Sequence, residues 1–396
     1  MTDQSTQPQN AGATRRDAPA STEDDPGQTN SGQREDPVVA NVVQKAPAGK
    51  ASPNQDRPPD DAPSSADDLL NRKRTPAQRI QHILHRNPAL SPLIVLVLAL
   101  IVFGIVAQNF LRPQALSLLV QQMAVVGALA VGQTLIILTA GIDLSIGMAM
   151  VLSSEVMVKL VYDHGVPGLL ALLVGAIVAV ATGALNGLLV TRMKLPPFIV
   201  TLGTFSIFTA VSLIYAKGQT IALTPNSLLL WTGKTISLGS FSVTYGVFLM
   251  LLLYAGVSFA LRNTAWGRHL YATGDDAEAS RLAGISTNRV LLSAYVVAGF
   301  CVGVAAWIVC GRVGGADPNS GLNYNLLSIT AVVIGGTSLF GGRGLVVGSL
   351  IGALIVQTFN SGLALAGVDP NYQVLAVGVL VILAVSVDQW IRRVKA

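Results

Sequence analysis

Long runs of apolar residues recur ten times between residue 90 and the end of the sequence. A helix needs about 20 mostly apolar residues to cross a hydrocarbon layer of about 30 Å, because it rises about 1.5 Å per residue. The runs are bounded by Pro, Gly or charged residues and lie at 90–107, 115–139, 144–161, 166–190, 198–216, 242–261, 290–311, 326–340, 345–363 and 372–390. They predict an all-α integral membrane protein of about ten transmembrane helices, of which the eighth is short for a full span.

The charged residues are concentrated ahead of these runs. Residues 1–89 hold 12 of the 21 acids and 11 of the 26 bases, although the whole chain is only 12% charged. The stretch from 1 to about 77 is rich in Pro, Gly, Ser, Gln and Asp and poor in aromatic and branched apolar residues, so it cannot bury enough surface to fold. We therefore expect a disordered cytoplasmic tail at 1–77 and a transmembrane domain at 78–396.

Lys and Arg residues are distributed unevenly between the two sets of connections. With the N-terminus inside, fifteen lie on the inner side and five on the outer side. Cytoplasmic connections carry the excess of Lys and Arg in membrane proteins. The pattern predicts a multi-pass protein with both termini in the cytoplasm; the bacterial inner membrane as its location is what the family resemblance described below implies. It also explains the net charge of +5 without a nucleic-acid partner.

Three segments carry two glycines four residues apart within an apolar run: Gly183–Gly187, Gly299–Gly303 and Gly348–Gly352. Small residues let helices approach closely in lipid, so these are expected to be packing faces. A weak internal similarity also links GIDLSIG at 141–147 to GRGLVVG at 342–348. Two similar tight turns explain it as well as a duplication does.

The sequence has no pattern of an enzyme. The one Gly233-Lys234-Thr235 has Leu228 where a phosphate-binding loop needs its first glycine. There is also no nucleophile elbow, zinc-protease helix or paired-carboxylate spacing, and the histidines and cysteines show no metal-ligand spacing. We expect no catalytic residue, no metal site and no ATP hydrolysis on this chain.

The largest inner connection runs from 262 to 289, and its part from Asp275 to Leu282 predicts a short amphipathic helix. Asp275 or Asp276 can cap its start and Gly284 can end it. Such a helix facing the cytoplasm is either a docking element for another protein or a solvated connection, and the residues alone favour neither.

Polar residues within the apolar runs are candidates for a solute pathway. Glu155 is the one acid well inside a run, and the simpler interpretation pairs it with Lys159 four residues on. Asp143 and Ser145 are expected to cap a helix, or to mark a broken helix that lines a path. The uncharged candidates are Gln133, Asn186, Thr201 and Asn360, each of which can instead bridge helices.

Four ordered motifs resemble the permeases of ribose-type sugar ABC importers, carbohydrate uptake family 2. They are GQTLIILTAGIDLSIG at 132–147, LNGLLVTRMKLPPFIVTLGT at 185–204, GRHLYATGDDAEASRLAGIS at 267–286 and ITAVVIGGTSLFGGRG at 329–344. Within the family, RMKLPPFIVTLG, RNTAWGR and VDQWIRR look most like permeases assigned to fructose import. The resemblance covers nearly everything from about residue 90 onward.

The resemblance implies a permease subunit that passes a small monosaccharide, fructose or a ribose-like sugar, into the cytoplasm. Its partners would be a second permease copy, a cytoplasmic ATPase that binds ATP and Mg²⁺, and a periplasmic sugar-binding protein, all assembled at the lipid membrane. The 262–289 connection would couple the permease to the ATPase, with the family motif at Gly274, Asp275, Glu278, Ala279, Leu282, Ala283, Gly284 and Ile285. Leu282 and Ile285 would seat in a cleft of the ATPase.

Two alternatives stay open. One is an ABC permease for another small polar solute, such as a nucleoside, a furanose signal or an amino acid, although the ribose-type motifs argue against an amino-acid carrier. The other is a secondary transporter, which is expected to place ion-coupling acids near the midplane. This chain offers only Glu155 and Asp143 for that role.

Overall fold

The computed structural model describes residues 90–225 and 227–393. The predicted tail at 1–77 and its boundary lie outside these residues. The helices are α3 (Leu90–Val106), α4 (Pro113–Leu138), α5 (Ile146–His164), α6 (Gly168–Arg192), α7 (Pro197–Ala216), the 3-10 helix η1 (Leu228–Gly233), α8 (Tyr245–Asn263), α9 (Ala265–Asp275), α10 (Ala277–Leu282), α11 (Thr287–Val313), α12 (Gly321–Ile334), α13 (Val346–Leu365) and α14 (Pro370–Arg393).

Each of the ten apolar runs contains a helix, from α3 to α8 and from α11 to α14. Six helices of the described part are long and apolar enough to cross a membrane, namely α4, α6, α7, α8, α11 and α13. α3 and α12 are apolar but shorter, with 17 and 14 residues. The chain is therefore an integral membrane protein built from helices, and the count of about ten spans stays a prediction.

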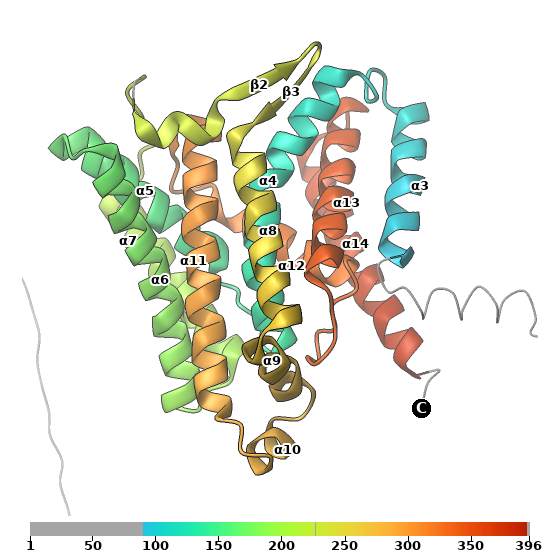
Figure 1. The fold of residues 1–396 in the computed structure, drawn as a ribbon. Helices are drawn as coiled ribbons and strands as arrows, with labels where there is room; N and C mark the ends of the chain where they lie inside the picture. The colour runs from blue at the N-terminus through green and yellow to red at the C-terminus, as the bar shows by residue number, and fades with distance from the viewer. Residues whose placement is uncertain (1–89, 226, 394–396) are drawn as a thin grey trace, which may run out of the picture. The chain divides into compact units, whose positions relative to one another are not determined.

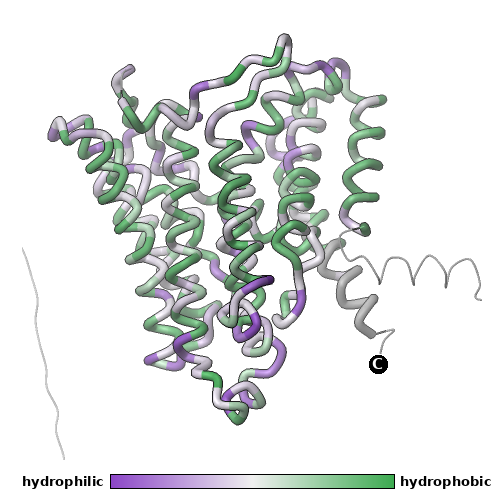
Figure 2. The backbone as a smooth tube through the Cα atoms, viewed as in Figure 1, coloured by the Kyte–Doolittle hydropathy of each residue, from purple (hydrophilic) through white to green (hydrophobic). Residues whose placement is uncertain are grey.

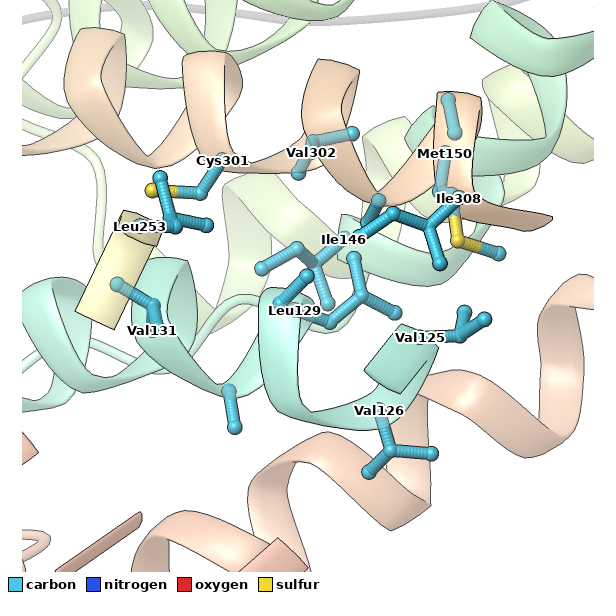
Figure 3. Close-up of a cluster of buried hydrophobic side chains, with 14 of the residues drawn as sticks. Val125, Val126, Leu129, Val131, Ile146, Met150, Leu253, Cys301, Val302 and Ile308 are labelled. Carbon is cyan, nitrogen blue, oxygen red and sulfur yellow. The ribbon is translucent and has the colours of Figure 1, made fainter. Parts of the chain in front are cut away.

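α4 lies at the centre of the bundle. Every residue from Met123 to Leu138 is buried, as expected of a helix that other helices enclose. α8, α11, α12 and α13 pack around it. Figure 3 shows Val125, Val126, Leu129 and Val131 of α4 among apolar side chains of α5, α8 and α11.

Large apolar side chains also cover the outside of the bundle, as in Ile105, Ile177, Ile214 and Leu252. A solvated surface would not carry so many, so these faces meet lipid. In Figure 2 hydrophobic residues follow the long helices, whereas hydrophilic residues gather near α9 and α10.

The three small-residue faces are packing sites, as predicted. A Cβ atom added at Gly183 would lie 2.4 Å from the Tyr295 carbonyl oxygen, and one at Gly299 would lie 2.6 Å from that of Ala179. These two faces therefore hold α6 against α11. Gly352 approaches Ala331 in the same way and joins α13 to α12.

The connection between α7 and α8 contains strands that the sequence analysis did not predict. β2 (Thr235–Leu238) and β3 (Phe241–Thr244) form an antiparallel hairpin, with Leu238 opposite Phe241. β1 (Ile221–Ala222) pairs with β4 (Gly315–Ala316) after α11. The all-α prediction is thus corrected to a helical bundle with short strands. We call this end of the bundle the hairpin end, and the opposite end, which carries α10, the α10 end (Figure 1).

Tertiary contacts explain two departures from the predicted helices. α12 begins at Gly321 rather than 326, since its polar first turn packs on the start of α5, where Asn325 Oδ1 accepts from the Gly147 amide at 2.5 Å. α9 precedes the predicted short helix and was not expected. It forms because Leu270 is fully buried and Trp266 packs against the core.

Candidate functional site

The chain is broken between α4 and α5, and most of the predicted pathway residues meet at this break. Residues 139–145 are irregular, and Ala140 adopts a positive φ of 59°. The Asn186 amide of α6 donates to Ser145 Oγ at 2.8 Å, and that hydroxyl donates to Asp143 Oδ1 at 2.7 Å. The three side chains form one buried hydrogen-bonded chain.

Two further candidates brace the same segment. Thr201 Oγ1 of α7 donates to the Ile142 carbonyl oxygen at 3.0 Å. The Gln133 carboxamide of α4, oriented so that both of its groups are satisfied, donates to the Asp143 carbonyl oxygen at 3.2 Å and accepts from the Asp143 amide at 3.3 Å. Irregular backbone at membrane depth needs such partners, because no water is there to replace them.

Asp143 and Ser145 were both expected to cap a helix, and this is correct only for Asp143. Asp143 Oδ1 accepts from the Ser145 amide at 2.7 Å, next to the start of α5. Ser145 occupies the N-cap position, but its side chain caps no helical N–H, since its hydroxyl is directed to Asp143. The broken helix and a local cap therefore coexist.

The break encloses a small cavity of about 10 Å³, lined by Asp143, Thr182, Asn186 and Tyr295 among others. Two of its lining residues, Asn186 and Tyr295, each have a buried atom without a hydrogen-bond partner among the described residues, Oδ1 and the hydroxyl oxygen respectively. A volume of this size holds about one water molecule. The five residues at the break therefore do not form a sugar-sized site in this conformation.

Glu155 lies apart from the break, and its predicted partner is wrong. Lys159 pairs with Asp163, Nζ to Oδ2 at 2.7 Å. The fully buried Glu155 instead accepts from Ser212 Oγ of α7 at 2.6 Å, and its other oxygen has no hydrogen-bond partner within the described part of the chain. Ser212 was missed because a lone serine in an apolar run carries no pattern.

Asn360 lies at the hairpin end, near the last turns of α13. It lines a pocket of about 570 Å³ between the α3–α4 connection, the start of α4, the end of α13 and the start of α14. Gln122 of α4 and Gln373 of α14 line the same pocket. The sequence analysis selected Asn360 alone, because the runs do not reveal which helix ends meet.

The predicted amphipathic helix is α10, at the opposite end of the bundle (Figure 1). Asp276 is its cap and accepts from the amides of Glu278 and Ala279, each at 2.9 Å. Gly284 ends it with a positive φ of 84°, which glycine adopts without strain. The adjacent Arg281 lowers the pKa of Glu278, so this carboxyl is ionised at neutral pH.

The motif residues of this loop separate into an exposed and a buried group. Leu282 is 79% exposed, and its side chain is therefore accessible to a partner. Ile285 is half-buried against the core, so it offers less of its surface to a partner than Leu282 does. The other exposed members are Asp275, Glu278, Ala279, Ala283 and Gly284.

Gly274 is the buried member, and it joins the loop to the break. A Cβ atom there would lie 1.8 Å from the Leu138 carbonyl oxygen at the end of α4. The Gly342 amide donates to that same oxygen at 2.9 Å. The end of α9, the end of α4 and the 341–344 segment therefore touch through their backbones, next to both segments of the weak internal similarity.

Comparison with known proteins identifies relatives over most of the chain. A family model described as branched-chain amino acid transport system / permease component matches residues 115–385. A fructose import permease protein of Rhizobium meliloti is 48% identical over 328 residues, which is 82% of this chain and 91% of that protein. A ribose import permease protein of Bacillus subtilis is 38% identical over 301 residues, 76% of this chain and 92% of that protein.

A galactose/methyl galactoside import permease protein of Escherichia coli is 30% identical over 309 residues, 74% of this chain and 91% of that protein. No solved structure gives a significant match.

Proposed function

We propose that this chain, which belongs to the family of branched-chain amino acid transport system permease components, imports a monosaccharide, and that the sugar is fructose. The proposal rests on the 48% identity to a fructose import permease over 82% of this chain. Other relatives named above are permeases for ribose and galactose, so a ribose-like sugar is the second candidate.

The chain is a transport subunit of the bacterial inner membrane, and it acts with other proteins. We propose a cytoplasmic ATPase that binds ATP and Mg²⁺, a periplasmic sugar receptor and a second copy of this chain as its partners. Both termini, including the tail at 1–77, are proposed to face the cytoplasm, because the excess of Lys and Arg lies on that side.

The α10 end is the proposed ATPase contact. α10 is a capped helix that exposes Leu282 beside a charged pair of Glu278 and Arg281, whose Oε1 and Nη2 atoms are 2.5 Å apart. An exposed apolar side chain ringed by charge is suited to docking in a protein cleft. Gly274 links this surface to the α4–α5 break, so a tilt of α9 is expected to move the break.

At the break, Gln133, Asp143, Ser145, Asn186 and Thr201 are proposed to hold the closed pathway rather than to bind sugar, because their polar groups bond to each other or to backbone. Glu155 and Ser212 are proposed to brace α5 against α7. Asn360, by contrast, lines a pocket of about 570 Å³, which is large enough for a sugar.

The function is tested by uptake of labelled fructose, ribose and galactose in cells with and without this chain, with the ATPase present. Gly284→Arg should abolish uptake and the sugar-stimulated ATPase activity while the protein still inserts, because the arginine must adopt a strained positive φ next to Leu282. Gly218→Arg, at another exposed positive-φ glycine outside the loop, is the control and should transport normally.

Normal transport by Gly284→Arg would contradict the coupling role. Fructose uptake that persists without the ATPase would favour a secondary transporter.

A further inference from the structure

The pocket at the hairpin end is lined by amides and hydroxyls rather than by carboxylates. Its polar residues come from four parts of the fold: Asn109, Arg112, Gln114, Gln122, Asn360, Ser361 and Gln373. No Asp or Glu is among its described lining residues. Its volume of about 570 Å³ lies within the range of small-molecule sites.

Several of these polar groups are free to bind a ligand. Asn360 has no side-chain hydrogen-bond partner in the part of the chain that the structure describes, although it is half-buried. Gln122 uses only its Oε1 atom, which accepts from Gln357 Nε2 at 2.5 Å. Gln373 donates to the Val368 carbonyl oxygen at 2.8 Å, which leaves its own carbonyl oxygen available.

One buried residue holds two walls of the pocket in register. Gln357 is 5% exposed, and its Nε2 atom donates to Gln122 Oε1 on α4 and to Ser361 Oγ at 3.1 Å on α13. The pocket groups of α4 and α13 are therefore fixed before a ligand arrives, which lowers the entropy lost on binding. Gln357 is a positioning residue, since it does not itself line the pocket.

This chemistry selects a class of ligand. Each hydroxyl of a sugar both donates and accepts a hydrogen bond, and each carboxamide offers both functions on one planar group. Leu118 and Leu365 supply apolar surface for the C–H face of a ring. An amino acid would bury its ammonium group without a carboxylate partner, which is costly.

We propose that this pocket is a monosaccharide site, at which sugar leaving the receptor contacts Asn360, Gln122 and Gln373 before it moves toward the closed break. This site rests on the proposed function, because its ligand is the same sugar that the chain is proposed to import. The pocket lies at the opposite end of the bundle from α10. It assigns sugar recognition to the hairpin end, in a conformation whose break holds about one water molecule.

The test measures uptake of the best sugar of the panel by Asn360→Leu and Gln357→Leu, with Gln219→Leu as the control. Gln219 is an exposed glutamine after α7 that lies outside the pocket. Loss of one neutral hydrogen bond should lower the uptake rate about fivefold for Asn360→Leu. Asn360→Ser should recover part of the rate, and Gln219→Leu should match the wild type.

A second measurement removes the contribution of the receptor. The rates for the sugar and for each of its monodeoxy analogues are compared in wild type and Asn360→Leu with the same receptor, so receptor selectivity cancels. The variant should lose discrimination at one hydroxyl and keep it at the others. Membrane abundance of each variant is measured alongside, and Asn360→Ser serves as the reporter if the leucine variant does not accumulate.

The outcomes separate the two proposals. If the wild type imports no sugar of the panel, the proposed function fails. If the wild type imports sugar and the pocket variants have unchanged rates and unchanged analogue ratios, the monosaccharide site is wrong and the proposed function stands. An altered rate without any change in the analogue ratios would also overturn the site, because it indicates a structural role.

Discussion

At the scale of single residues, the buried polar groups of this protein are mostly committed to the protein itself. Thr201 and Gln133 bond to the backbone of the break, and Asn186 bonds to Ser145. A polar group without a partner costs several kcal/mol in the bilayer core, and mutations that leave a buried polar group unpaired cost about 1–3 kcal/mol of protein stability. Each of these contacts therefore stabilises the irregular segment. Substitutions at Gly274 and Ser212 test how much the stability of the protein depends on such close contacts.

Gly274→Ala should destabilise the protein by about 1–3 kcal/mol, the usual range for overpacking. The new methyl group would lie 1.8 Å from the Leu138 carbonyl oxygen and 2.8 Å from the Gly342 nitrogen, both of which belong to the backbone. Gly203→Ala is the control, because nothing lies within 4 Å of its Cβ position and alanine favours the helix. Thermal unfolding of the purified protein in detergent measures both, and equal midpoints would contradict the close packing.

Ser212→Ala should destabilise the protein by about 1–3 kcal/mol, because it leaves the buried Glu155 carboxyl group without its partner. The double variant Glu155→Leu with Ser212→Ala should recover part of the loss, since no polar group is then left unpaired. Thermal unfolding of Ser212→Ala, Glu155→Leu and the double variant gives the coupling free energy between the two side chains. Strict additivity would show that the two side chains do not interact.

At the scale of elements, α10 is too short to be stable by itself and depends on its cap and on its neighbours. A helix of six residues forms fewer than two turns, and nucleating the first turn is unfavourable. Asp276 satisfies two of its free amides, and Ser280 is buried against the bundle. The shape of the proposed ATPase contact thus depends on one carboxylate.

Asp276→Ala should speed amide hydrogen exchange at residues 277–282 about fivefold, because removing an N-cap costs about 1 kcal/mol. Sugar-stimulated ATPase activity should fall with it. Asp276→Ser keeps a capping oxygen, so it should retain the slow exchange and the sugar-stimulated ATPase activity of the wild type. Asp275→Ala removes a neighbouring exposed acid that caps nothing among the described residues, and it should leave the exchange rates unchanged. Equal exchange in Asp275→Ala and Asp276→Ala would contradict the cap.

At the scale of the whole molecule, the two ends of the bundle are chemically different. The α10 end carries the exposed charged loop, and the hairpin end carries the strands and the amide-lined pocket. The Lys and Arg count predicts that the α10 end faces the cytoplasm and the hairpin end faces the periplasm. A reporter at each end tests this assignment directly.

Alkaline phosphatase fused after Gly239 should be active, because this exposed turn of the β2–β3 hairpin is predicted to face the oxidising periplasm. The same enzyme fused after Gly284 should be inactive, and a fluorescent protein there should fold. Membrane fractions of cells that express each fusion provide the measurement. Activity at both positions, or the reverse pattern, would overturn the proposed orientation.

The sequence by itself determined the helical membrane architecture, the family and a short helix that ends at Leu282, whose capping residue it left open between Asp275 and Asp276. Apolar run length, residues with small side chains and a capping aspartate act locally, so they can be recognised without knowing what packs where. α9, β1, β3 and the first turn of α12 were missed, because contacts with elements distant in sequence hold them in place. β2 is exposed and pairs with the adjacent β3, and its apolar alternation was too short to be recognised.

The tertiary structure decided what the polar residues do. Gln133, Asp143, Ser145, Asn186 and Thr201 come from α4, the break, α6 and α7, and only the packing of these elements places them in one network. The packing of α7 on α5 brings Ser212 within hydrogen-bond distance of Glu155, so Glu155 accepts from Ser212 and Lys159 pairs with Asp163. It also brought Asn360 together with Gln122, which precedes it by more than 200 positions, because hydrogen bonds and pockets depend on distance in space and not on separation along the chain.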